Sequence, residues 1–63
     1  MIMYSEITQQ AFKQLVNISD KSFKTEKSEY ADKVYWNVHG IIVVAVTNYL
    51  TSVTQYYVQD INA

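Results

Sequence analysis

The chain has 63 residues, no cysteine, one histidine, one glycine and a formal net charge of −1. This length allows one small domain, residues 1–63, whose core rarely contributes more than about 3–5 kcal/mol of stability. The missing cysteines exclude disulfides and thiolate metal sites, and a single histidine forms no metal-binding cluster. Small chains of this kind need very good packing or a partner, and we expect oligomerisation.

The charge balance argues against nucleic acid as a partner. Binding to phosphates needs clustered Lys and Arg side chains, whereas five basic and six acidic residues nearly cancel here. Residues 1–6 lack the basic run and long apolar stretch of a secretory signal. An absence of cysteine is compatible with any compartment, so localisation stays open, with the cytoplasm slightly favoured.

The N-terminal segment has the spacing of an amphipathic helix over about residues 5–18. Apolar residues recur three and four positions apart: Met3, Ile7, Ala11, Leu15 and Ile18. Ser5 is a candidate N-cap, because its side chain can accept a hydrogen bond from a backbone N–H of the first turn. The Ser and Asp residues at 19–22 favour a stop, since their side chains compete for backbone hydrogen bonds.

The composition of residues 23–30 predicts a charged edge strand, the third strand beside two from the second half of the chain. Its alternating Lys and Glu residues would protect an exposed edge against unwanted pairing. Carboxylates and lysines are interleaved along 20–33, which is typical of a solvated surface rather than of a catalytic carboxylate pair.

The second half differs in composition from the first. Between Val34 and Gln59 the only titratable group besides tyrosine is His39, and residues 33–63 include thirteen β-branched and five aromatic residues. Such residues lose rotamer freedom in helices and pack well on sheets, so strands are favoured. The alternative is a long second helix, because apolar residues from Tyr30 to Tyr56 also recur at helical spacing; that helical hairpin would dimerise into a four-helix bundle.

The continuous apolar run in this half, Ile41 to Val46, is too short to span a membrane, so no membrane span is predicted. Two chain paths fit the strands. Either His39 and Gly40 form a two-residue hairpin turn, or one long strand passes through Gly40, turns at 48–52 and returns over 53–61. The second path is preferred because it keeps 34–46 in one phase. Its helix-facing side chains would be Val34, Trp36, Val38, Ile42, Val44 and Val46, leaving Ile41, Val43 and Tyr49 uncovered.

The residues offer no catalytic constellation. His39 is the only base that titrates near neutral pH, and no acidic residue lies near it in sequence. One glycine cannot build a phosphate-binding loop. We therefore expect no enzyme and no catalytic, cofactor or metal site.

The predicted fold is α+β, with one N-terminal amphipathic helix packed on a small antiparallel sheet from the C-terminal half. Tyr and Trp are enriched at protein interfaces, which makes the uncharged half the expected interaction surface. The predicted interaction residues are Tyr35, Trp36, Ile41, Val43, Tyr49 and Tyr57. We expect a non-catalytic protein-binding module, a homo-oligomer that docks on and regulates or inhibits a protein partner. The alternative is a structural or assembly subunit that uses the same surface permanently.

Overall fold

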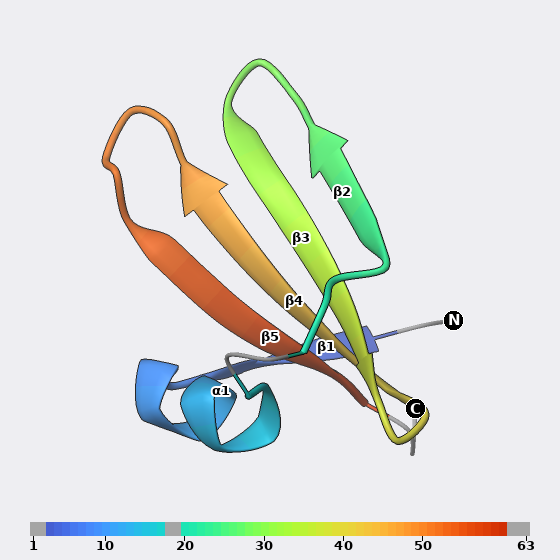
Figure 1. The fold of residues 1–63 in the computed structure, drawn as a ribbon. Coiled ribbons are helices and arrows are strands. Elements are labelled where there is room, and N and C mark those ends of the chain that lie inside the picture. Colours follow the sequence, from blue (N-terminus) through green and yellow to red (C-terminus); the bar gives the residue numbers. More distant parts are fainter. Residues whose placement is uncertain (1–2, 18–19, 61–63) are drawn as a thin grey trace.

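The computed structural model describes residues 3–17 and 20–60. Five strands form one antiparallel sheet in the order β1-β5-β4-β3-β2. A short helix lies against this sheet at one end, far from the β2–β3 and β4–β5 turns (Figure 1). The elements in chain order are β1 (Met3–Ile7), α1 (Gln9–Leu15), β2 (Lys24–Lys27), β3 (Ala31–Val38), β4 (Ile41–Asn48) and β5 (Thr54–Asp60).

The predicted α+β fold with a long N-terminal helix is wrong, and so is the helical hairpin. Most of the described chain is antiparallel sheet, and α1 has only seven residues. Residues 3–7 pair with β5 instead of forming the first helical turns, because backbone pairing along a sheet edge outweighs a weak helical preference. Thr8, not Ser5, caps the helix, and its Oγ1 accepts a hydrogen bond from the Ala11 N–H at 3.1 Å. Ile18 lies outside the described residues.

His39 and Gly40 form a two-residue turn between β3 and β4. Both have positive φ, 53° and 86°, as in the type I′ turn whose twist matches that of the flanking strands. The Gly40 N–H donates a hydrogen bond to Asn37 Oδ1 at 2.8 Å. The preferred path of one strand through Gly40 is therefore wrong, because the chain reverses and Val38 pairs with Ile41.

This turn decides which side chains share a face of the sheet, because directly paired residues point to the same side. Trp36, Val43 and Val58 are paired in register and lie on the face that α1 covers. The preferred path predicted that Ile42, Val44 and Val46 of β4 would face the helix, and this phase is wrong. In the structure Ile41, Val43 and Ala45 lie on the helix side, whereas Ile42, Val44 and Val46 lie on the other face.

Phe12 anchors α1 to the sheet. Its ring meets the Trp36 ring edge-on at a centroid distance of 5.2 Å and stacks on the Tyr56 ring at 4.3 Å. The buried apolar residues of the described chain are few: Val16, Val43, Val44 and Ala45. This small core agrees with the limit that the chain length sets.

Two other expectations are confirmed. The charged edge strand exists as β2, and all four of its side chains are exposed. The chain also turns where predicted, after Asn48, whose Oδ1 accepts a hydrogen bond from the Leu50 N–H at 2.8 Å. Strand β5 then returns from Thr54.

Replacing Gly40 by alanine tests the turn. A Cβ at Gly40 would meet no atom within 4 Å, so its cost is purely conformational. We expect Gly40→Ala to lower the free energy of unfolding by about 1–2 kcal/mol, measured from the urea midpoint at unchanged m-value. His39→Asn, which tolerates positive φ, should stay within about 0.5 kcal/mol of the parent chain. Equal stability of the parent chain and Gly40→Ala would contradict the turn.

Removing the Phe12 ring tests how α1 is held. Phe12 is half-buried, so Phe12→Ala should lower the free energy of unfolding, measured by urea denaturation, by about 2–3 kcal/mol. Replacing a fully buried aromatic residue by alanine costs about 3–5 kcal/mol. The fluorescence of Trp36, the ring that Phe12 contacts, should change in the same variant. Phe23→Ala is the control, because Phe23 is 57% exposed. This substitution should lower the free energy of unfolding by less than about 1 kcal/mol. Equal losses in both variants would show that Phe12 is not the anchor.

Candidate functional site

The sheet face opposite α1 carries an open, apolar groove of about 370 Å³, which we call the open-face groove. Four strands contribute its lining. Three aromatic residues, two valines and one cation form it: Tyr4, Tyr35, Tyr57, Val44, Val46 and Lys33. Cross-strand pairing brings these residues together, because alternate positions of paired strands face the same side.

One row of paired residues, the central row, runs across all five strands of this face. It reads Lys24, Tyr35, Val44, Tyr57 and Glu6 from β2 to β1. Val44 is its floor and is only 5% exposed, with a tyrosine on each side of it. The two ends of the row therefore carry opposite charges, a cation at the β2 edge and a carboxylate at the β1 edge.

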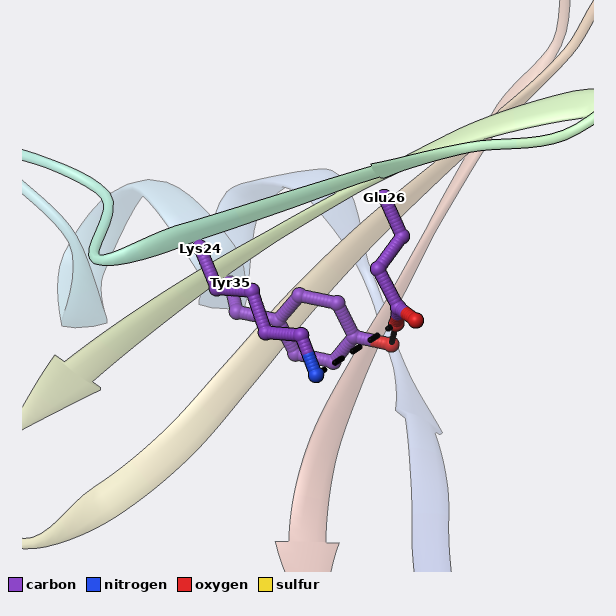
Figure 2. Close-up of polar contacts among 3 residues, drawn as sticks. All are labelled: Lys24, Glu26 and Tyr35. Atoms are coloured by element: carbon purple, nitrogen blue, oxygen red, sulfur yellow. Dashed lines mark hydrogen bonds and ion pairs between the residues drawn. The ribbon is translucent and has the colours of Figure 1, made fainter.

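Polar contacts hold the Tyr35 wall of the groove. The Tyr35 hydroxyl donates a hydrogen bond to Glu26 Oε1. Lys24 Nζ lies 4.0 Å from the same carboxylate oxygen and 5.3 Å from the centre of the Tyr35 ring. Figure 2 shows the three side chains meeting from neighbouring strands. The contacts fix the ring in place and leave the Lys24 side chain exposed at the edge.

These contacts change two ionisation equilibria. The hydrogen bond to Glu26 raises the pKa of Tyr35 to about 12, because only the neutral phenol can donate a proton to the carboxylate. The same hydrogen bond, together with the charge of Lys24, lowers the pKa of Glu26. Both shifts favour a neutral tyrosine bonded to an ionised glutamate over a wide pH range.

The six predicted interaction residues fall into three places. Tyr35 and Tyr57 line the open-face groove. Three others lie on the helix side of the sheet: Trp36, Ile41 and Val43. Tyr49 follows β4, and its hydroxyl donates a hydrogen bond to Asp32. The structure thus brings two of the six together in the groove.

Sequence reasoning missed Tyr4, which lines the groove from β1. The helical spacing of residues 3–18 concealed a short alternation, in which Met3, Ser5 and Ile7 point to one face and Tyr4 and Glu6 to the other. That period-2 pattern indicates a strand over residues 3–7, and Thr8 as an N-cap indicates that the helix begins only after it.

A second apolar surface, the apolar tip, lies at the β2–β3 and β4–β5 turns, at the end of the sheet far from α1 (Figure 1). Its exposed side chains come from two turns: Tyr30, Tyr49, Leu50 and Val53. The Tyr49 N–H donates a hydrogen bond to the Tyr30 carbonyl at 2.9 Å, which ties the two turns together. Leu50 is 85% exposed, so the tip is an apolar projection, whereas the open-face groove is concave.

Within residues 3–17 and 20–60, no three His, Asp or Glu side chains gather closely enough to hold a metal ion. The helix in this part of the chain is too short to cross a membrane. No family model, curated protein or solved structure matches the chain.

Removing the Glu26 carboxylate tests the Tyr35 contact. Glu26→Gln should move the Tyr35 pKa down from about 12 toward its ordinary value near 10, because the charged acceptor is lost. In the parent chain the folded-state pKa of Tyr35 lies above the unfolded one, so, while Glu26 is ionised, this contact stabilises the fold fully up to about pH 10. Its contribution falls as the pH rises toward about 12.

The measurement is the ultraviolet absorbance of tyrosinate against pH, with the Tyr35 component identified by subtracting the titration of Tyr35→Phe. Glu29→Gln is the matched control, because Glu29 has no contact with Tyr35 among the described hydrogen bonds. A Tyr35 midpoint that is the same in the parent chain and in Glu26→Gln would refute the contact.

Proposed function

We propose that this chain is a non-catalytic protein-binding module that acts as a homo-oligomer and binds protein through the open-face groove. The observation that carries the proposal is the groove itself, a concave apolar surface with three tyrosines on a sheet face that α1 leaves uncovered. Buried tyrosines supply large contact area with a polar hydroxyl at one end, which is why they are frequent in the centre of protein interfaces.

The small core supports the need for a covering partner. Val43 is the one large side chain of the described residues that is fully buried. A chain with so little buried apolar area is marginally stable alone. A partner that binds the folded form stabilises it by mass action, so covering the groove would also strengthen the fold.

The charges around the groove favour protein over nucleic acid. Lys24 and Lys33 on this face are matched by Glu6 and Glu26, whereas nucleic-acid surfaces concentrate positive charge. The groove is also open rather than enclosed, and small ligands are usually buried over most of their surface. The broad surface of a protein partner therefore fits this open groove better than a small ligand does.

A structural or assembly subunit remains the second proposal for the same surface. The two proposals differ in how the oligomer behaves on dilution. A binding module should dissociate reversibly into folded monomers, whereas a permanent subunit should lose its fold together with its partner.

Changing one groove residue to lysine tests the proposal. We expect the parent chain to show a mass above the 7.3 kDa monomer at micromolar concentration in light scattering coupled to gel filtration. Tyr57→Lys places a charge in the centre of the groove, so it should shift the mass to that of the monomer. Far-UV circular dichroism should show that the variant keeps its sheet.

Tyr30→Lys is the control, because it makes the same replacement at the apolar tip, where Tyr30 is 65% exposed. This variant should associate as the parent chain does. A parent chain that stays monomeric at every concentration would overturn the proposal. Loss of association in Tyr30→Lys but not in Tyr57→Lys would transfer the binding surface from the groove to the tip, and equal loss in both variants would overturn the assignment to the groove.

A further inference from the structure

We infer that the open-face groove is occupied by a second copy of this chain, packed face to face around a two-fold axis that runs parallel to β4. This inference rests on the proposed function and names the partner and its orientation. In this arrangement Val44 of each copy lies over its counterpart, and Lys24 of each copy faces Glu6 of the partner subunit.

The geometry follows from how sheets stack. Two sheets pack face to face about 10 Å apart with their strands nearly aligned. A two-fold axis parallel to the strands reverses the order of the strands across the sheet and keeps their direction. Strand β4 is the central strand of five, so it faces itself, β3 faces the partner's β5, and β2 faces the partner's β1.

The charges select this axis over the perpendicular one. In the central row the cation Lys24 stands at one end and the carboxylate Glu6 at the other. Reversing the row places opposite charges over each other at both ends. A two-fold axis perpendicular to the strands that passes through the central row would instead place Lys24 over Lys24 and Glu6 over Glu6, and like-charge juxtaposition opposes association.

The side chains between the charges are also compatible with the reversed row. Tyr35 faces the partner's Tyr57, and tyrosine rings pack well at the spacing of stacked sheets. The apolar residues of β4 on this face form a stripe along the axis and meet their own copies: Ile42, Val44 and Val46. In the adjacent row Lys33 faces the partner's Gln55, a polar pairing without charge conflict.

The available area fits a reversible dimer. Five strands about 4.8 Å apart and up to eight residues long give a face of roughly 500 Å² in projection. A standard interface buries about 800 Å² per partner, which is about one sixth of the 4915 Å² surface of this chain. The open face is therefore smaller than a standard interface, in the size class of weak complexes that dissociate readily on dilution.

Reversing the charges tests the orientation. Lys24→Glu and Glu6→Lys each place like charges opposite each other, twice per dimer by symmetry. Each single variant should raise the dimer dissociation constant by about tenfold at low salt. The double variant Lys24→Glu/Glu6→Lys restores both pairs with reversed sign and should return to within about threefold of the parent constant. Sedimentation velocity over a concentration series measures all four constants.

Lys27→Glu is the matched control. It makes the same charge change on β2, but Lys27 pairs with Asp32 and points to the other face of the sheet, so the dissociation constant should stay unchanged. A dimer that responds to none of these reversals overturns the inference and leaves the proposed function standing. A chain that does not dimerise at all overturns both.

Cysteine crosslinking tests the axis without changing charge pairs, because the parent chain has no cysteine. Val46→Cys lies on the axis and should crosslink to itself through a short bis-maleimide linker. Lys33→Cys lies off the axis, so it should crosslink efficiently only when mixed with Gln55→Cys. Efficient self-crosslinking of Lys33→Cys, with little for Val46→Cys, overturns the inference.

Discussion

The structure depends on one constraint. The sheet carries apolar side chains at the centre of both faces, and the one helix of the described residues, seven residues long, covers only one of them. Phe12 fixes that helix over Trp36 and Tyr56, and Val43 beneath it is the best-buried residue of the described chain. On the other face Val44 is nearly buried, and Tyr35 and Tyr57 flank it in the central row. Exposed apolar area of this kind favours association.

The two-residue turn at His39 and Gly40 distributes the apolar residues between these faces. Because β4 is apolar at six successive positions, Ile41 to Val46, either phase would present aliphatic side chains to the helix. The positive φ angles of the turn select one phase, and a shift by one residue would exchange the two faces. The groove is thus a consequence of turn chemistry as much as of the strand sequences.

The sequence was sufficient to favour strands over a helix in the second half and to predict the charged edge strand and the turn after Asn48, because β-branched residues and Asn carry strong local preferences. It was not sufficient to choose the turn at His39 and Gly40, which divides the predicted long strand into β3 and β4. It was not sufficient for residues 3–7, where helical spacing and strand alternation coincide and pairing with β5 decides. Nor could it show which side chains of β4 face the helix, because residues 41–46 are all apolar and either alternation is possible. Of the groove, Tyr35 and Tyr57 could be predicted, whereas Tyr4 required the position of β1.

The most direct test of the account is a nuclear Overhauser experiment filtered for contacts between isotope-labelled and unlabelled copies of the full chain. The account predicts contacts between copies that join the Tyr35 ring to the Tyr57 ring and connect Val44 to its counterpart. Contacts between copies that instead involve Trp36 or Phe12 would contradict it, because those rings lie on the helix-covered face. An associated chain without any contact in the open-face groove would contradict it equally.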